Sequence, residues 1–346
     1  MLSFFDRQRR DLPWRRTRDP YAIWLSETML QQTRVETVIP YYERFLARFP
    51  TVEALADADA DELMGSWAGL GYYSRARNLK AAASQVVREH GGRIPDDVEV
   101  LRTLPGVGRY TAGALASIAF DRPAPIVDGN VARVLARLLD LDLDVRSPAG
   151  QHRLWEAAGA LARGPAPGEL NQALMELGAL VCTPRAPRCP DCPLRADCRG
   201  RAAGRAEALP VKARPAEPKE VAAVAVLLAR GTRVLAVRRP PHGLLGGLWE
   251  LPGGELAADE PPLAGLRRAL RAGIGLAPRK AKPLGLVTHG FTHRALSLHV
   301  FRATAPAGRV RRRGFDAHRW LPLAALEGLP LSALAKKALA LAAEEA

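Results

Sequence analysis

Long apolar runs are absent from this 346-residue chain. No window approaches the ~18 uninterrupted apolar residues of a membrane-spanning helix. The first ten residues, MLSFFDRQRR, also lack the apolar core of a secretory signal. Aromatic residues are scarce at 6% of the chain, and 15 of the 20 lie before position 156. These absences argue against a membrane protein and a secreted one, so we expect a globular protein that works in the cytoplasm.

Acidic residues are too few to balance the basic ones. The chain has 36 Asp and Glu against 50 Lys and Arg, which gives a formal net charge of +14. Such an excess favours a polyanionic partner, and nucleic acid is the usual one. The alternative is a basic surface that only keeps the protein in solution.

The hydrophobic pattern changes near residue 200, which predicts two domains. Apolar residues recur at helical spacing in 23–39, 76–87, 111–119, 131–139 and 170–181. Later runs in 221–229, 234–237, 284–287 and 296–301 are typical of strands, with a helical pattern in 263–274. Residues 200–219 have few large apolar side chains and are typical of a linker. We predict a mainly α domain over 1–199, a linker over 200–219 and an α+β domain over 220–346.

The few cysteines are gathered in one place. Six, two and five residues separate the four of them, Cys182, Cys189, Cys192 and Cys198. Without a secretory signal a disulfide framework is not expected, whereas four local thiolates suit a metal centre. Zinc ribbons usually carry two Cys-x-x-Cys pairs and this segment has one, so spacing favours iron–sulfur over zinc and leaves both open. Arginines within the segment make it a basic loop that suits phosphate contact.

A glycine-rich turn precedes one of the expected helices. Gly106 and Gly108 in LPGVG allow a tight turn that presents backbone amides to an anion such as one DNA phosphate. An ordinary turn between helices is the alternative. Twenty residues later, Asp128 in IVDGNV opens another expected helix, and taken alone it is typical of an N-cap.

The glycine turn, the downstream aspartate and the cysteine loop, in this order, resemble the endonuclease III superfamily of helix-hairpin-helix DNA glycosylases. The segment 24–34, WLSETMLQQTR, is similar to the adenine-specific branch of that superfamily. The resemblance covers nearly the whole chain. It implies a [4Fe–4S] cluster on the four cysteines, and excision of adenine mispaired with 8-oxoguanine or guanine in double-stranded DNA. The sequence has no heptads or other oligomerisation signal, so we expect a monomer, and we expect it in the bacterial cytoplasm, associated with the nucleoid.

The resemblance assigns the chemistry to two carboxyl groups. Glu27 would protonate the departing adenine, and Asp128 would stabilise the sugar cation or form a transient adduct with it. The apolar neighbours of Glu27 support this role, because burial raises a carboxyl pKa. Tyr110 and Asn130 would orient Asp128 and the sugar. Bifunctional relatives carry a lysine nucleophile at the position of Tyr110, so Schiff-base lyase activity is not expected.

Other positions match the family's DNA contacts. The target base must leave the helix stack, and Gln32 and Tyr72 match the residues that intercalate into the gap. Tyr72 is also compatible with a core aromatic. Gly106 and Gly108 would bind the backbone, and Arg15 matches a pocket position.

The last domain resembles a Nudix domain that has lost its metal site. The segment LPGGE at 251–255 and the helix after it keep Gly254, Glu260 and Arg268 of the family signature. The metal-binding glutamates of the signature are replaced by Ala269, Ala272 and Gly273. Mg²⁺ needs hard oxygen ligands, so we predict no pyrophosphatase activity.

A short loop in this domain is similar to the family's lesion-recognition loop. It consists of Phe291, Thr292 and His293, with threonine in place of the usual serine. The threonine hydroxyl keeps both hydrogen-bonding capacities towards 8-oxoguanine. Three alternatives stay open: an endonuclease III type glycosylase of other specificity, a Nudix hydrolase with a DNA-targeting N-terminal module, and a lesion-binding protein without activity.

Overall fold

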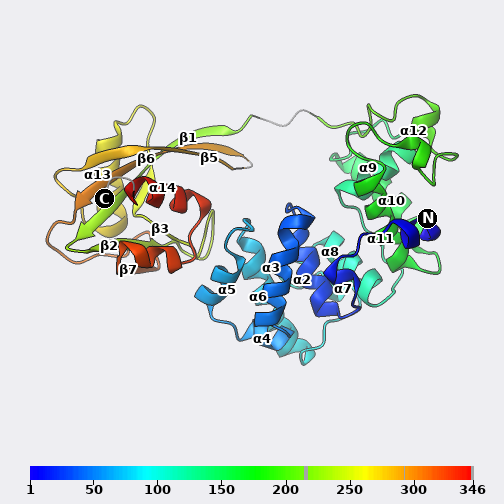
Figure 1. Ribbon diagram of the computed structural model, residues 1–346, viewed down its shortest axis with the longest axis horizontal. Helices are drawn as coiled ribbons and strands as arrows, with labels where there is room; N and C mark the ends of the chain where they lie inside the picture. Colours follow the sequence, from blue (N-terminus) through cyan, green and yellow to red (C-terminus); the bar gives the residue numbers. More distant parts are fainter. Residues whose placement is uncertain (214–216, 292, 344–346) are drawn as a thin grey trace. The chain divides into compact units, whose positions relative to one another are not determined.

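Helices make up the chain as far as residue 202, and strands begin only at residue 219 (Figure 1). The computed structural model describes residues 1–213, 217–291 and 293–343. Contacts group the chain into two compact units, one of residues 1–58 and 77–214, the other of residues 59–76 and 215–346. The predicted order, a helical domain and then an α+β domain, is confirmed.

The helical part contains twelve α-helices with short 3₁₀ and π segments between them among the described residues. They are α1 (Leu2–Gln8), η1 (Pro13–Arg15), α2 (Pro20–Leu30), α3 (Val35–Arg48), α4 (Val52–Ala56), α5 (Ala60–Trp67), α6 (Ser74–His90), α7 (Val98–Leu101), α8 (Arg109–Ala114), η2 (Leu115–Ala119), α9 (Gly129–Leu138), α10 (Pro148–Ala162), α11 (Pro167–Leu180), η3 (Cys189–Asp191) and α12 (Arg199–Ala202).

Local sequence explains where the helices that form the site begin. Asp19 caps α2 by accepting from the backbone N–H groups of residues 21 and 22, and Pro20 follows at the first helical position. Asp128 caps α9 through the N–H of Val131, and Ser147 caps α10 through the N–H of Gly150. These caps place the first turn of α9, and with it Asp128, at a fixed position in the unit.

The close approach of α9 and α11 depends on one glycine. A Cβ atom at Gly178 would lie 2.6 Å from the Asn130 Cβ, which no side chain tolerates. Val131, Val134 and Leu177 pack in the apolar cluster between these helices. The helices α9 and α11 are therefore in close contact at the first turn of α9, directly after Asp128.

A mixed sheet forms the centre of the C-terminal part. Its order is β3-β2-β1-β6-β5, with β4 also paired to β1 and β7 to β2. β1 and β6 are parallel, whereas the other pairs are antiparallel. The strands are β1 (Lys219–Arg230), β2 (Arg233–Arg238), β3 (Trp249–Glu250), β4 (Gly253–Glu255), β5 (Lys282–Phe291), β6 (Arg294–Thr304) and β7 (Ala317–Pro322), with helices α13 (Pro262–Ile274), η4 (Leu323–Gly328) and α14 (Ala333–Ala343).

Each face of this sheet is covered by one helix. Val224 and Val226 on β1 pack with Leu266 and Leu270 of α13, while the alternate residues Ala223, Ala225 and Leu227 pack in the cluster that contains α14. The period of two in β1 thus divides a nearly continuous apolar run between two cores. In the ranges that the structure describes, no helix combines the length and the apolar character needed to traverse a bilayer.

Candidate active site

Glu27 lies in the most buried helix of the N-terminal unit. Every residue of α2 from Tyr21 to Met29 is buried, and Glu27 is 6% exposed. The hydroxyls of Ser26 and Thr28 donate to carbonyls within the helix and that of Tyr21 donates to the Phe49 carbonyl, so the Glu27 carboxyl still needs a partner from another element.

Tyr110 of α8 supplies that partner. Its hydroxyl lies 2.6 Å from Glu27 Oε2. The pKa of Glu27 is raised to about 7, mainly by burial and also by Asp128, against the lowering effects of the Tyr110 hydrogen bond and Arg15. Burial also raises the pKa of Tyr110, so the phenol stays protonated. Glu27 is therefore a carboxyl group that can hold a proton at neutral pH.

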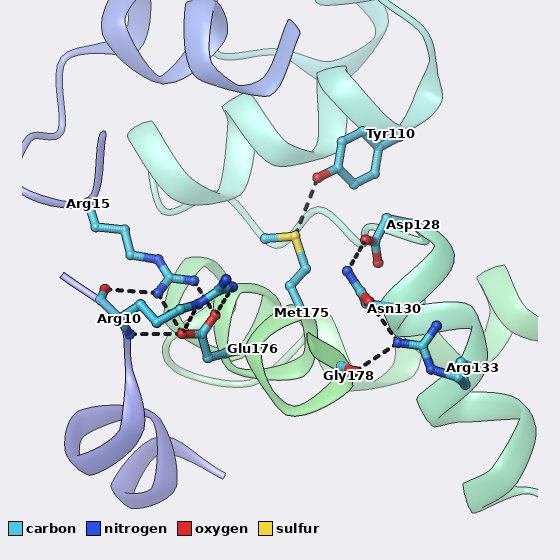
Figure 2. Close-up of polar contacts among 9 residues, drawn as sticks. All are labelled: Arg10, Arg15, Tyr110, Asp128, Asn130, Arg133, Met175, Glu176 and Gly178. Atoms are coloured by element: carbon cyan, nitrogen blue, oxygen red, sulfur yellow. Dashed lines mark hydrogen bonds and ion pairs between the residues drawn. The ribbon is translucent and has the colours of Figure 1, made fainter. Parts of the chain in front are cut away.

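Asp128 has a different set of partners. Its Oδ1 accepts from the N–H of Val131 at 2.7 Å. Its Oδ2 accepts from Asn130 Nδ2 at 3.0 Å (Figure 2). Burial raises the pKa of Asp128, while these hydrogen bonds and the Arg133 charge lower it. The net pKa of Asp128 is raised by burial, but Asp128 has more contacts that favour the charged form than Glu27 has, so Asp128 is the better candidate for an anion and Glu27 for an acid.

Both carboxyl groups open on one cavity of about 710 Å³. It is lined by most of the residues predicted for the catalytic site and its DNA contacts, namely Arg15, Glu27, Gln32, Gly106, Gly108, Tyr110, Asp128 and Asn130. Trp14, Gln172 and Met175 also line it. The predicted residues, up to 115 positions apart in the sequence, thus meet at a space large enough for a nucleobase.

Two arginines and a glutamate in this cavity form an ion-pair cluster that the sequence did not reveal. Glu176 has no exposed side-chain surface and accepts bidentate contacts from both Arg10 and Arg15 at 2.8–3.0 Å (Figure 2). Burial alone would raise the pKa of Glu176, but these hydrogen bonds lower it to about 2. The position of Glu176 between Met175 and Leu177 in an apolar helix could have indicated a buried carboxyl group, as the apolar neighbours of Glu27 did.

A chain of hydrogen bonds connects Asn130 to the cysteine loop. Asn130 Oδ1 and the Gly178 carbonyl both accept from Arg133 Nη2 at 2.7 Å (Figure 2). Arg133 Nε donates to the Cys182 carbonyl at 2.7 Å, and Nη1 donates to the Gly129 carbonyl at 3.1 Å. The orientation of Asn130, and through it that of Asp128, is therefore fixed from two helices and from the start of the loop.

The four cysteines line one cavity with an apolar wall. All are free and half-buried. Over the described ranges, no three Cys, His, Asp or Glu side chains form a group placed to hold a metal ion. The chemistry of the surroundings nevertheless fits an anionic cluster, because Arg137 is 2% exposed and its guanidinium donates to three carbonyls and to Cys182 Sγ, the last at 3.3 Å. A buried cation needs a negative counter-charge, which thiolates supply.

The hairpin and intercalation candidates occupy turns. Gly106 has a φ of +76°, and a Cβ there would lie 2.7 Å from the Asn78 Cβ, so this position requires glycine. Gly108 precedes α8 and faces open space. Gln32 is exposed with a φ of 57°, and Tyr72 is 46% exposed with a φ of 46°. Tyr72 is therefore a surface aromatic in this structure, as intercalation requires, and the core alternative does not apply.

The C-terminal unit contains a second cavity of about 570 Å³. Ala269, Ala272 and Gly273 line it, so the positions where the signature has glutamates face this space without a carboxylate. Phe291 also lines it, and His293 is exposed. Thr292 lies outside the described residues.

Comparisons with known proteins agree with both units. Residues 25–157 match the family model of the HhH-GPD superfamily of base excision DNA repair proteins, and residues 223–341 match that of the NUDIX domain. The fold of a thermostable thymine-DNA glycosylase superposes with a TM-score of 0.53 at 34% identity, over 57% of this chain and 91% of that one.

Curated relatives extend the similarity to both units together. The adenine DNA glycosylase of Rattus norvegicus is 38% identical over 97% of this chain and 76% of the rat protein. That of Mus musculus is 39% identical over 89% of this chain and 72% of the mouse protein. The chain therefore belongs to the adenine DNA glycosylase family.

Proposed function

We propose that this protein excises adenine mispaired with 8-oxoguanine or guanine from duplex DNA, by hydrolysis of the N-glycosidic bond. The observation that carries the proposal is the pair of unlike carboxyl groups on one base-sized cavity. Burial raises the pKa of Glu27 to about 7 and its hydrogen-bond partner is a phenol, whereas the Asp128 carboxylate accepts hydrogen bonds from Val131 and Asn130. The chain acts alone, as a monomer, on double-stranded DNA.

Glu27 acts as the general acid. Adenine leaves poorly as an anion, so the Glu27 proton passes to a ring nitrogen while the bond from the sugar C1′ to the base breaks. The bonding electrons go to the neutralised base, and the sugar becomes an oxocarbenium ion. The resulting Glu27 carboxylate is stabilised at once by the Tyr110 hydroxyl, 2.6 Å from Oε2.

Asp128 stabilises the positive sugar. Its carboxylate lies against the same cavity, and Asn130 Nδ2 and the Val131 N–H keep it charged and oriented. A water molecule then adds to C1′ and loses its proton, which leaves an abasic site. Tyr110 cannot form an imine, so the strand is not cut by Schiff-base chemistry.

DNA distortion precedes this chemistry. Unstacking a base costs a few kcal/mol, and the exposed residues Gln32 and Tyr72 fill the space that the flipped adenine leaves. The turn at Gly106 and Gly108 binds a backbone phosphate. Arg15, held by Glu176, shapes the wall of the base cavity.

The cysteine loop holds a [4Fe–4S] cluster through Cys182, Cys189, Cys192 and Cys198. When bound, the cluster pins the loop and supplies negative charge beside the buried Arg137 guanidinium. We expect a brown protein with iron bound to the chain. A colourless preparation with one zinc ion per chain would contradict this assignment.

The C-terminal unit reads the lesion without hydrolysing nucleotides. Phe291, Thr292 and His293 form the proposed contact with 8-oxoguanine. His293→Ala should reduce the rate advantage of 8-oxoguanine over guanine, whereas the exposed His242→Ala should leave it unchanged.

The proposal is tested with duplexes that carry adenine opposite 8-oxoguanine, G, C or T. Single-turnover base release should be fastest opposite 8-oxoguanine, slower opposite G and negligible opposite C and T. The product strand should stay intact until it is treated with alkali. Release of another base, or strand cutting without alkali, would favour an endonuclease III type activity instead.

A further inference from the structure

Arg109 is an exposed arginine that has no acidic partner. It is the first residue of α8 and directly follows Gly108. Within the part of the chain that the structure describes, its guanidinium makes no ion pair and no hydrogen bond. The acid nearest to it in the surrounding wall, Glu99, is already used, because both of its carboxylate oxygens lie 3.2 Å from Arg102 Nη1. The charge of Arg109 is therefore available to a ligand.

The Trp155 ring of α10 holds this guanidinium in one orientation. Arg109 Cζ lies 3.9 Å from the centroid of the ring, well inside the ~6 Å of a cation–π contact. The ring is itself fixed, because Trp155 is 9% exposed and its Nε1 donates to Gln151 Oε1 at 3.1 Å. A guanidinium is planar, so stacking on a ring leaves the N–H groups at its edges free to donate. The stack thus orients the donors of Arg109 without occupying them.

Arg109 lies at the exposed edge of the base cavity. It lines both the cavity of about 710 Å³ and a smaller one of about 290 Å³ formed by residues of α7, α8 and α10. Its sequence neighbours Gly108 and Tyr110 also line the larger cavity, and the Tyr110 hydroxyl contacts Glu27 there. A nucleotide that turns its base into this cavity keeps its phosphates outside, in the DNA backbone. These phosphates are the anions that would meet the unpaired guanidinium.

We infer that Arg109, oriented by Trp155, binds a phosphate of the DNA strand that carries the target adenine, in addition to the phosphate assigned to the turn at Gly106 and Gly108. This inference rests on the proposed function, because it requires the adenine in the cavity. Two oxygens of one phosphodiester match the paired N–H groups of a guanidinium. A phosphate contact has no base specificity, so it should strengthen binding equally opposite 8-oxoguanine and opposite guanine.

The first test measures how binding depends on salt in Arg109→Gln. Each phosphate contact adds about 0.9 to the slope of the logarithm of the binding constant against the logarithm of the salt concentration, so the slope should become shallower by about 0.9. Between 50 and 200 mM salt, the wild type should then lose about threefold more affinity than the variant. Fluorescence anisotropy measures binding to an A:8-oxoguanine duplex whose adenosine carries a 2′-fluorine, which prevents cleavage by destabilising the sugar cation.

The matched control for the salt test is Arg102→Gln. Arg102 lines the same small cavity as Arg109, but it is paired with Glu99. Its replacement removes an equal charge from the protein, and the salt slope should stay that of the wild type. An equal change of slope in both variants would mean that the total charge of this surface is measured, and it would overturn the assignment to Arg109.

The second test locates the phosphate. One linkage at a time, near the adenine, is replaced by a neutral methylphosphonate, and the affinity of each duplex is measured. The wild type should lose affinity at one linkage of the adenine strand at which Arg109→Gln loses none. At all other linkages the two proteins should respond alike. A scan in which no linkage distinguishes them would overturn the inference.

The role of the ring is tested with Trp155→Leu. Removing the stacking face should weaken duplex binding by about twofold to fivefold, and it should have no further effect in Arg109→Gln. Trp155→Phe keeps an aromatic face and should bind more like the wild type. Independent, additive losses in Trp155→Leu and Arg109→Gln would overturn the part of the inference that concerns Trp155.

Adenine release by the same proteins separates this inference from the proposed function. If the wild type released no adenine while the salt slope and the linkage scan depended on Arg109, the phosphate contact would stand and the proposed function would fail. If adenine were released and the salt slope were unchanged in Arg109→Gln, the phosphate contact alone would be refuted.

Discussion

The cavity lined by Glu27 and the cavity of the C-terminal unit are similar in size but differ in the carboxyl groups that line them. The cavity in the helical unit measures about 710 Å³ and contains Glu27 and Asp128. The cavity in the C-terminal unit measures about 570 Å³ and has Ala269, Ala272 and Gly273 where the Nudix signature has glutamates. Both units have a family fold and a large cavity, so neither the fold nor the cavity volume by itself shows which reaction a site can catalyse.

The acids that remain around the second cavity are neutralised by arginine. Glu250 pairs with Arg239 at 3.0 Å, Glu255 with Arg294 at 2.6 Å and Glu260 with Arg268 at 2.6 Å. In the first cavity Glu176 is neutralised in the same way, whereas Glu27 contacts only a phenol and keeps a raised pKa. Glu27 therefore differs from these arginine-paired acids because it is buried without a cation at hydrogen-bonding distance.

Removing that acid should produce the largest effect. Glu27→Gln keeps the shape of the side chain and removes the transferable proton, so adenine release should fall by ~10³-fold or more, since general acids contribute ~10²–10⁴-fold. Duplex binding should be retained. The measurement is single-turnover release from an A:8-oxoguanine duplex.

The control for this variant is Glu43→Gln, at an exposed position of α3. Its rate should stay within about twofold of the wild type. Comparable activity in Glu27→Gln and Glu43→Gln would remove the distinction between the two cavities, because neither would then contain a working acid.

Asp128→Asn should lower the rate by ~10²-fold through loss of charge. Asparagine caps helices as well as aspartate does, so α9 and the fold should be retained. Asp97→Asn makes the same change at the exposed N-cap of α7 and should not alter release. A thermal midpoint that fell in Asp128→Asn but not in Asp97→Asn would mean that the charge supports folding instead of catalysis.

Sequence predicted the helical unit and the strands β1, β2, β5 and β6, because each has a local apolar pattern. The roles of Glu27 and Asp128 came from the family resemblance and stay predictions. The apolar runs at 221–229 and 296–301 became β1 and β6, and the helical pattern at 263–274 became α13. β3 and β4 were not predicted because two or three residues show no periodicity, and β7 and α14 went unrecognised.

The cluster of Arg10, Arg15 and Glu176 is a part of the site that could not be predicted from the sequence. Arg10 and Glu176 are 166 positions apart, and nothing local marks Arg10 among the basic residues around it. Only the packing of the first residues against α11 brings them together. Contacts between residues that are far apart in the sequence could not be predicted from the sequence alone.

The rate of adenine release should depend on pH through Glu27. The acid must be protonated to act, and its pKa is about 7. Below pH 7 the rate should be flat, and above it the rate should fall about tenfold per pH unit. A profile that rises through pH 7 would make Glu27 a base and would contradict the assignment.

The same raised pKa should make Glu27 destabilising at alkaline pH. The native state holds this proton more tightly than the unfolded chain, whose glutamate pKa is near 4.5, so the stabilisation is present at low pH and is lost as the pH rises to 7. The advantage of Glu27→Gln over wild type in the free energy of unfolding should therefore grow by roughly 2–3 kcal/mol from pH 5 to pH 8. Urea denaturation at the two pH values measures it, and Glu43→Gln should show no such growth.

The second cavity should give the smallest effects. Mg²⁺ should support no pyrophosphate release from oxidised dGTP, and Ala272→Glu should not restore it, because one carboxylate among Ala269 and Gly273 does not form a Mg²⁺ site. Gly273 is also a poor position for a new ligand, since its Cβ would lie 3.1 Å from the Phe315 ring. Phosphate release is measured with and without Mg²⁺, and adenine release should be equal in both. Hydrolysis by the wild-type chain would show that carboxylates at other positions than Ala269, Ala272 and Gly273 can hold the metal. The two cavities would then differ in their substrates, and the second would not have lost its activity.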